Sequence, residues 1–445
     1  VVTTTGGTFT YDGQAHGATV EVSELPKGYT VQTAASTSTA TDVTTGEGVF
    51  ATADQLVIVN AAGEDVTSKL KIKYVDGTIV INPRSVTLTS ATDSKTYDGT
   101  PLTNSEVTAE GFVDGEGATY DVTGSQTLVG SSDNTFTYTL KDGTAASNYD
   151  IETVFGKLTV TDRTEKYEIT VEANSGEHKY DGTEKTASGF KTLEFEVEGN
   201  TYTVEGLTAS ETQTQAGTYT VEITGTAVVK DAGGNDVTAQ FIVTEVDGEL
   251  VINKAALTIT ADDASKVYDG TALTKDSYTN SDLAAGDEIA SVTVTGSQTI
   301  VGTSANVPSA AVIKNAAGED VTASYDITYA NGTLEVTKKA ITITADDATK
   351  TYDGTALVKN SYTNSALGAG DKIDSVTVTG SQTVVGSSNN VPSAAKIVDA
   401  NGKDVTASYK ITYANGTLTV TQKEITITAD SDSKVYNGTP LTKNS

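Results

Sequence analysis

The chain has 445 residues, more than one hydrophobic core accommodates, so several domains are expected. Its formal net charge of −30, from 59 acidic against 29 basic residues, argues against nucleic-acid partners and against anionic membranes. Cysteine is absent, which excludes disulfides and thiolate metal sites. No apolar run is long enough to span a bilayer, and we expect no membrane insertion in this segment.

A Tyr-Asp-Gly tripeptide, which reads Tyr-Asn-Gly in its last copy, recurs along the chain with a long period. The tyrosines of its six copies are Tyr11, Tyr97, Tyr180, Tyr268, Tyr352 and Tyr436. Successive copies are 83–88 residues apart, and a closing signature such as "TIVI" from Thr78 or "TLEV" from Thr333 follows each of the first five. A period of this length, holding several strands, is typical of a small domain rather than of one solenoid coil.

These two signatures predict five repeats and the start of a truncated sixth. The predicted ranges are 1–83, 84–162, 163–253, 254–338, 339–422 and 423–445. The second, fourth and fifth repeats share "VTGSQT" and form subtype B, whereas the first and third lack it and form subtype A. The closing strand of one repeat runs almost directly into the next, and such short connectors favour an elongated, stiff rod.

Alternating side chains predict the strands. Leu257 and Ile259 share one face of "ALTIT", and Leu334 and Val336 share one face of "TLEV", with polar residues between them. One polar face per sheet favours antiparallel pairing. At most one helical turn is expected at "DVTASY", where Asp320 or Asp404 can cap free backbone N–H groups. We therefore predict an all-β, mostly antiparallel fold: a tandem array of small two-layer domains, either Ig-like sandwiches or β-grasp-like.

The aspartate of Tyr-Asp-Gly has two interpretations, a functional carboxylate or a turn residue. The sixth copy reads Tyr436-Asn437-Gly438, and an amide does not replace a general acid or a metal-binding carboxylate. Asp and Asn both suit tight turns, and Gly tolerates positive φ. The sequence therefore predicts a turn, with the tyrosine ring on the domain core or at the junction with the next domain. We predict no catalytic residues and no enzyme.

A second set of Gly dipeptides precedes the closing strands. The set comprises Asp76-Gly77, Asp247-Gly248, Asn331-Gly332 and Asn415-Gly416, with Phe155-Gly156 as the exception. Asp-Gly and Asn-Gly are the preferred two-residue hairpin turns. We expect a hairpin at each of these positions.

Other polar residues are weighed as ligands. The pairs Asp262-Asp263 and Asp346-Asp347 could hold Ca²⁺ near a domain junction, the alternative being solvated charge. The only histidines, His16 and His178, lack metal-ligand spacing. A lysine lies two residues before the tyrosine in four copies, at Lys95, Lys266, Lys350 and Lys434. We expect it to be exposed, or to extend its charged end to the surface, rather than to form an isopeptide crosslink.

The motif residues resemble a known family. The Tyr-Asp-Gly opening, "VTGSQT" and "GEDVTASYDITYANGTLEV" are similar to the MBG/YDG-type repeats of large bacterial surface proteins, especially adhesin-like, wall-anchored proteins of Gram-positive gut bacteria. The resemblance implies an extracellular location at the cell surface, with an anchor outside these residues. It brings no catalytic residues and no cofactor.

We expect a structural stalk or spacer that projects a distal binding region from the cell, with neighbouring repeats as its partners. One alternative is that the repeats themselves bind host glycan, mucin or matrix. A second alternative is a subunit of a self-assembling extracellular fibre.

Overall fold

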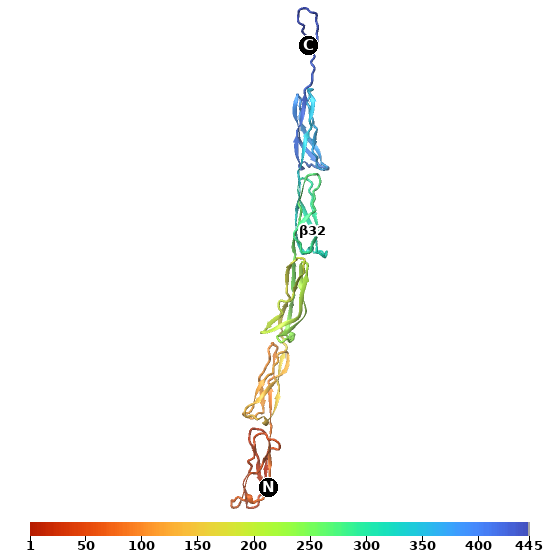
Figure 1. Ribbon diagram of the computed structural model, residues 1–445. Coiled ribbons are helices and arrows are strands. Elements are labelled where there is room, and N and C mark those ends of the chain that lie inside the picture. The colour runs from red at the N-terminus through yellow and green to blue at the C-terminus, as the bar shows by residue number, and fades with distance from the viewer. Residues whose placement is uncertain (444–445) are drawn as a thin grey trace. The chain divides into compact units, whose positions relative to one another are not determined.

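A computed structural model describes residues 1–443, and its regular structure consists of β-strands and five single 3₁₀ turns (Figure 1). The predicted all-β, mostly antiparallel fold is confirmed. The chain divides into two compact units, and the division passes through the third repeat. The first unit comprises 1–173, 189–209 and 223–247, and the second comprises 174–188, 210–222 and the chain from 248 onward. In the described residues no helix is long and apolar enough to cross a membrane.

The first unit contains the strands of the first two repeats. They are β1 (Val2–Thr5), β2 (Gly7–Thr10), β3 (His16–Gly17), β4 (Thr19–Val22), β5 (Tyr29–Ala35), β6 (Thr39–Ala40), β7 (Val49–Ala51), β8 (Gln55–Asn60), β9 (Tyr74–Val75), β10 (Gly77–Asn82), β11 (Arg84–Ser90), β12 (Asp93–Thr96), β13 (Val107–Glu110), β14 (Ala118–Val122), β15 (Gly130–Asp133), β16 (Phe136–Leu140), β17 (Tyr149–Val154) and β18 (Lys157–Thr161).

The strands of the third repeat are distributed over both units. They are β19 (Tyr167–Glu172), β20 (Gly176–Lys179), β21 (Lys185–Ser188), β22 (Glu194–Val197), β23 (Asn200–Gln213), β24 (Gly217–Val221), β25 (Ile223–Asp231), β26 (Phe241–Val246) and β27 (Gly248–Asn253).

The second unit contains the fourth and fifth repeats. Their strands are β28 (Ala255–Ala261), β29 (Ala264–Val267), β30 (Tyr278–Asn280), β31 (Glu288–Thr295), β32 (Gly302–Lys314), β33 (Tyr325–Ala330), β34 (Gly332–Thr337), β35 (Lys339–Ala345), β36 (Ala348–Thr351), β37 (Tyr362–Asn364), β38 (Lys372–Thr379), β39 (Gly386–Val398), β40 (Tyr409–Ala414) and β41 (Gly416–Thr421). The 3₁₀ turns of the chain are η1 (Thr67–Lys69), η2 (Ala146–Asn148), η3 (Thr238–Gln240), η4 (Thr322–Ser324) and η5 (Thr406–Ser408).

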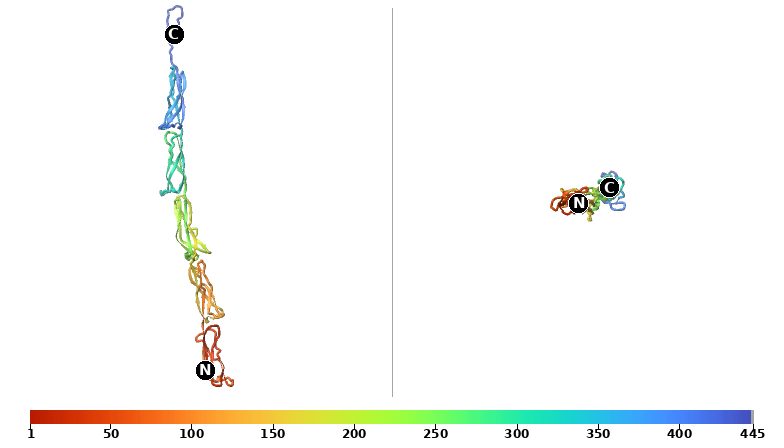
Figure 2. Two further views of the ribbon diagram at one scale, coloured as in Figure 1. Left: turned by 180° about the vertical axis from the view of Figure 1, so that it is seen from behind. Right: turned by 90° about the horizontal axis from the view of Figure 1, so that it is seen from below.

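The fourth repeat shows the topology most completely. One sheet has the order β30-β28-β33 and the other has the order β29-β34-β32-β31, so the opening strands β28 and β29 lie in different sheets. Figure 1 labels β32 of this repeat, and Figure 2 shows the same repeat from behind. The fifth repeat has the same arrangement, with sheets β37-β35-β40 and β36-β41-β39-β38.

The core lies between these two sheets. Leu257 and Ile259 of β28 and Leu334 and Val336 of β34 are all buried, while the threonines and acids between them lie at or near the surface. Each fully buried Leu or Ile contributes about 1.5–3 kcal/mol relative to an exposed one. Residues 1–443 contain no α-helix that could lie across a sheet, as a β-grasp requires. The two-layer sandwich is therefore the better description.

Each repeat also contains parallel pairs, which the alternation of side chains did not reveal. In the fourth repeat β28 is parallel to β33 over six residue pairs, and β29 is parallel to β34 over four. Alternation places a side chain on a face of a sheet but carries no information on strand direction. The opening and closing strands of a repeat therefore run the same way.

The predicted hairpins before the closing strands are wrong. β33 ends at Ala330 and β34 begins at Gly332, but the two strands lie in different sheets. Gly332 does not have a positive φ, as the expected turn would require. A Cβ on Gly332 would lie 2.4 Å from the carbonyl oxygen of Ala261, so glycine is needed here for close backbone approach. The same crowding exists at Gly77, Gly156 and Gly416.

Candidate functional site: the repeat junction

The predicted Tyr-Asp-Gly turn forms in all six copies. The Oδ1 atom of the Asp or Asn accepts the N–H of the residue two positions further on, at 2.9 Å for Asp269 and Thr271 and 3.2 Å for Asn437 and Thr439. The φ angle of the glycine lies between 75° and 83° in every copy, a region that glycine adopts readily. The carboxylate is therefore used to form the turn.

The lysine before the tyrosine completes this turn. Lys266 Nζ lies 2.8 Å from Asp269 Oδ1 and 2.8 Å from Thr271 Oγ1. In the first repeat His16 takes this place, 2.9 Å from Asp12. The Lys266 ammonium, followed by the Thr271 N–H, holds the pKa of Asp269 well below its usual range. The lysine is thus paired within its own repeat, with its side chain 21% exposed and its ammonium group at the turn.

The tyrosine of the motif joins its own repeat to the next one. Its backbone N–H donates to the last strand of its own repeat, at 2.8 Å from Tyr268 to Thr337. Its hydroxyl donates at 2.9 Å to Asp371 of the fifth repeat, and the hydroxyl of Tyr409 donates to the same Oδ2 atom at 2.5 Å. The two tyrosine rings meet edge to face, with centroids 5.3 Å apart. We call Tyr268, Asp371, Tyr409 and their counterparts the tyrosine clasp.

The clasp recurs between the third and fourth repeats, within the second unit. Asp287 Oδ2 accepts from Tyr180 at 2.9 Å and from Tyr325 at 2.6 Å, and the rings are 5.4 Å apart. Burial, and then the hydrogen bond to Asp287, raises the pKa of both tyrosines well above its usual value. The phenols therefore remain protonated donors at neutral pH.

The first unit contains a related clasp between the first and second repeats. Tyr11 donates at 2.5 Å to Glu116, and its ring packs edge to face on Tyr149 at 5.4 Å. Tyr149 accepts the N–H of Val113, as Tyr325 and Tyr409 accept those of Ala284 and Gly368. The hydrogen bond to Glu116 and burial raise the pKa of Tyr11 to about 12.

The glycine of the motif also contacts the next repeat. A Cβ on Gly270 would lie 2.4 Å from the carbonyl oxygen of Ala369, and the Ala369 N–H donates to the carbonyl oxygen of Asp269 at 2.6 Å. A Cβ on Gly182 would lie 2.7 Å from the carbonyl oxygen of Ala285. The glycine is therefore required for its φ angle and for the close approach of two repeats.

A second contact comes from the last residue of the 3₁₀ turn in the following repeat, which we call the turn anchor. Ser324 Oγ accepts the N–H of Ala216 at 3.0 Å, and Ser408 Oγ accepts the N–H of Val301 at 3.4 Å. Both serines are buried. The single helical turn predicted at "DVTASY" is present as a 3₁₀ turn, but its contribution to the junction was not foreseen.

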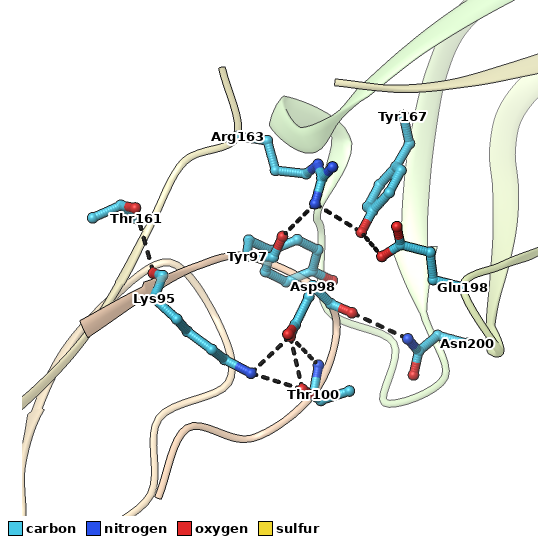
Figure 3. Close-up of polar contacts among 9 residues, drawn as sticks. All are labelled: Lys95, Tyr97, Asp98, Thr100, Thr161, Arg163, Tyr167, Glu198 and Asn200. Carbon is cyan, nitrogen blue, oxygen red and sulfur yellow. Dashed lines mark hydrogen bonds and ion pairs between the residues drawn. The ribbon is translucent and has the colours of Figure 1, made fainter. Parts of the chain in front are cut away.

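The junction between the second and third repeats is built differently (Figure 3). The guanidinium of Arg163 lies 3.9 Å from the centroid of Tyr167 and donates to the carbonyl oxygen of Tyr97 at 3.0 Å and to Tyr167 Oη at 2.9 Å. Tyr167 donates in turn to Glu198 at 2.5 Å, and Asn200 donates to the carbonyl oxygen of Asp98 at 3.1 Å. The following repeat here is of subtype A, whereas each clasp precedes a repeat of subtype B.

The fifth repeat shows the same turn without a folded neighbour. Tyr352 is 41% exposed, whereas Tyr268 is 2% exposed. A Cβ on Gly354 would meet nothing within 4 Å. Residues 422–443 contain no strand, and the remaining two residues of the predicted sixth repeat lie outside the described residues. Burial of the motif tyrosine therefore depends on the next repeat.

The acidic pairs weighed for calcium lie inside a repeat. Asp262 and Asp263 connect β28 to β29, where Asp262 accepts from Ser277 Oγ at 2.5 Å and Asp263 accepts the N–H of Thr333 at 2.6 Å. The structure thus places them at the crossing between sheets rather than at a junction. Within residues 1–443 no group of three or more His, Asp or Glu side chains is placed to hold a metal ion.

The acceptor residues of the clasp were missed in the sequence. Glu116, Asp287 and Asp371 each follow a glycine at matching places in the three subtype B repeats, in "DGEG", "AGDE" and "AGDK". An acidic residue directly after a glycine, at the same place in all three subtype B repeats, was the sequence feature that could have identified them.

Residues 257–335 match the family model described as "MBG domain (YGX type)". The match lies in the fourth repeat and confirms the resemblance to MBG/YDG-type repeats; MBG domains are typical of extracellular surface proteins. None of the curated protein sequences matches the chain significantly. The crystal structure of Drosophila N-cadherin EC1-4 is similar over 76% of this chain and 100% of that chain, with 9% identity and a TM-score of 0.14. A score this low supports no comparison of function.

Proposed function

Because the chain contains an MBG-type repeat domain and such domains are typical of extracellular surface proteins, we propose that it is a structural stalk of a bacterial adhesin-like surface protein. It projects a distal binding region away from the cell. The observation that supports this role is the clasp in which a motif tyrosine of one repeat donates to a carboxylate of the next.

Each clasp resists separation of the repeats that it joins. A hydrogen bond to a charged group contributes about 1.5–3 kcal/mol, and the buried tyrosine ring adds apolar contact. Only one residue, Lys254 or Lys338, separates the closing strand of one repeat from the opening strand of the next in the second unit. A connector this short leaves little freedom for the repeats to move independently. The net charge of −30 disfavours lateral association of stalks.

We further propose that the chain has no enzymatic activity. The recurrent carboxylate of the chain is that of the Tyr-Asp-Gly motif. In the fourth repeat this carboxylate, Asp269, accepts the N–H of Thr271 and pairs with the ammonium of Lys266. A group so engaged is poorly placed to transfer protons to a substrate or to bind a metal. Its low pKa also makes it a weak base at neutral pH.

Two partly exposed tyrosines, Tyr329 and Tyr413, also form hydrogen bonds within their own repeats. Tyr329 Oη accepts the N–H of Ala311 at 2.9 Å, and Tyr413 Oη accepts the N–H of Ala395 at 2.8 Å. Each bond lies next to an alanine with positive φ, Ala310 or Ala394. These tyrosines therefore support a strained strand, which favours a structural role over a sugar-binding platform.

The stalk function is tested by changing the number of repeats on a surface. The chain is tethered by one end, with an epitope at the other, and compared with a variant that lacks residues 339–422, one full period. The height of the epitope should fall by one domain length, about 30–40 Å. An unchanged height would contradict the spacer role, and binding of the untethered chain on a glycan array would favour the host-glycan alternative.

A further inference from the structure

The opening and closing strands of a repeat are parallel neighbours, and this determines how tension acts on them. In the fourth repeat the chain enters along β28, which pairs with β33 over six residues, and continues along β29, which pairs with β34 over four. It leaves from the end of β34 at Thr337. The N–H of Tyr268 donates to the carbonyl oxygen of Thr337 and extends the parallel ladder by one bond.

Tension applied to the two ends of this repeat draws β29 and β34 in opposite directions along their common axis. The hydrogen bonds between parallel strands are evenly spaced along that axis, so all of them are loaded together. An antiparallel hairpin pulled at its open end behaves differently, because its bonds break one pair at a time. Resistance to force thus depends on this topology and not only on the free energy of unfolding.

We propose that this parallel ladder is a mechanical clamp that lets each repeat bear tension along the chain. The proposal goes beyond the spacer function, although its biological use rests on that function. It applies to the second repeat, with β11 parallel to β17 and β12 parallel to β18, and to the fifth, with β35 parallel to β40 and β36 parallel to β41.

One strand of the ladder is held by the core, and the other lies at the edge of its sheet. Leu334 and Val336 of β34 are buried, and β34 is central in its sheet, with β29 on one side and β32 on the other. β29 is an edge strand and contains no buried residue, so β34 is the strand that the core holds in place when the two are drawn apart. The resistance of the clamp therefore comes from ladder bonds that are loaded together, and not from their exclusion from water.

The clamps of neighbouring repeats are connected in series. β34 ends at Thr337 and β35 begins at Lys339, so tension that leaves one ladder enters the next through Lys338 alone. No flexible segment separates them to take up the force. Each repeat of the pair is therefore loaded through its ends, in the direction that the ladder resists.

Pulling single molecules in two directions tests the clamp. The chain has no cysteine, so introduced thiols give unique handles. The intact chain is pulled from its two ends, and a variant with Glu288→Cys and Lys314→Cys is pulled across the open end of the β31–β32 hairpin of the fourth repeat, where these residues face each other. At the same loading rate we expect an end-to-end unfolding force about twofold or more above the hairpin force, because the ladder bonds yield together.

The length released identifies each event. End-to-end unfolding should release on the order of 250 Å per repeat, since a period of 84 residues extends by ~3.5 Å per residue and loses its folded length. The hairpin should release only the chain between its two handles. An unchanged urea midpoint in the double-cysteine variant controls for stability. End-to-end forces equal to or below the hairpin force would overturn the clamp, whatever the fate of the stalk proposal.

Discussion

Gly270 and Gly354 adopt the same φ of +83° but have different surroundings. A Cβ on Gly270 would lie 2.4 Å from the carbonyl oxygen of Ala369 in the next repeat, whereas one on Gly354 would meet nothing within 4 Å. Alanine substitutions at these two glycines can therefore be compared. Both would strain the backbone of the turn, but only the one at Gly270 would also clash with the next repeat.

We predict that Gly270→Ala destabilises the chain more than Gly354→Ala. Both substitutions incur a backbone strain of about 1 kcal/mol, and only the first adds a steric cost of ~1–3 kcal/mol at the junction. Equilibrium urea unfolding measures the two costs, and hydrogen exchange at the Ala369 amide reports opening of the junction. Equal costs, with no faster exchange at Ala369, would show that the glycine serves only the turn.

Tyr268→Phe tests the hydroxyl of the clasp while keeping the ring. Asp371 loses one of its two phenol donors, so we expect a loss of about 1–2 kcal/mol in the stability of the fourth and fifth repeats. The matched control is Tyr352→Phe, because that tyrosine is 41% exposed and should respond by less than about 0.5 kcal/mol. Similar losses in both variants would contradict the clasp.

Acid should weaken the Tyr-Asp-Gly turn. The pKa of Asp269 is lowered in the folded chain by Lys266 and Thr271, so its contribution is present above the ordinary carboxyl value near 4 and is lost as pH falls below it. The melting temperature should decline with falling pH in this range. Asp269→Asn, which imitates Asn437 of the sixth copy, should make the decline shallower. A decline that is identical in the variant would assign it to other carboxylates.

The turn was predictable from sequence because the exchange of Asp for Asn at position 437 excludes an essential carboxylate. The acceptors of the clasp were not, since Asp371 is 103 residues from Tyr268 and sits in a loop whose composition resembles any exposed turn. A contact between residues of different repeats cannot be recognised from the sequence alone, even when both residues lie at recurring positions.

At the scale of strands, alternation predicted the residues of the core but not the direction of pairing. The faces of Leu257, Ile259, Leu334 and Val336 were assigned correctly, because period two follows from strand geometry alone. The Asn331-Gly332 dipeptide was assigned to a hairpin, although glycine is needed there because the backbone of Ala261 passes close by. An Asn-Gly dipeptide suits both a hairpin turn and a site where two backbones approach closely, and only the packing in the structure distinguishes the two.

Gly332→Ala tests this account of the sheet crossing. The new Cβ would collide with main-chain oxygens of Ala261 and Asp262, which cannot move as a side chain can, so we expect a loss of ~1–3 kcal/mol or more. Gly318→Ala is the control, because Gly318 has a φ of +80° with nothing within 4 Å and should cost about 1 kcal/mol from backbone strain. The assignment fails if the denaturation midpoints show the reverse order.

At the scale of the whole molecule, the period of the motif predicted a series of similar β domains, and the family match within the fourth repeat agrees with it. The repeat boundaries and the extended series of repeats remain predictions. Their physical basis is local: a clasp, a turn anchor and a one-residue connector at successive junctions within a unit. The periodicity of the sequence does not predict these contacts, because it identifies the residues of each repeat but not which residues of two neighbouring repeats touch.

Small-angle scattering of the intact chain in solution tests most directly whether such junctions hold the repeats in line. Five domains of 30–40 Å placed end to end should give a radius of gyration of about 50 Å, unchanged when calcium is added or removed. A radius near the value of roughly 22 Å that scaling gives for a compact chain of this length would contradict the account. A large extension on adding calcium would contradict it as well, since the clasp binds one repeat to the next through phenol and carboxylate alone.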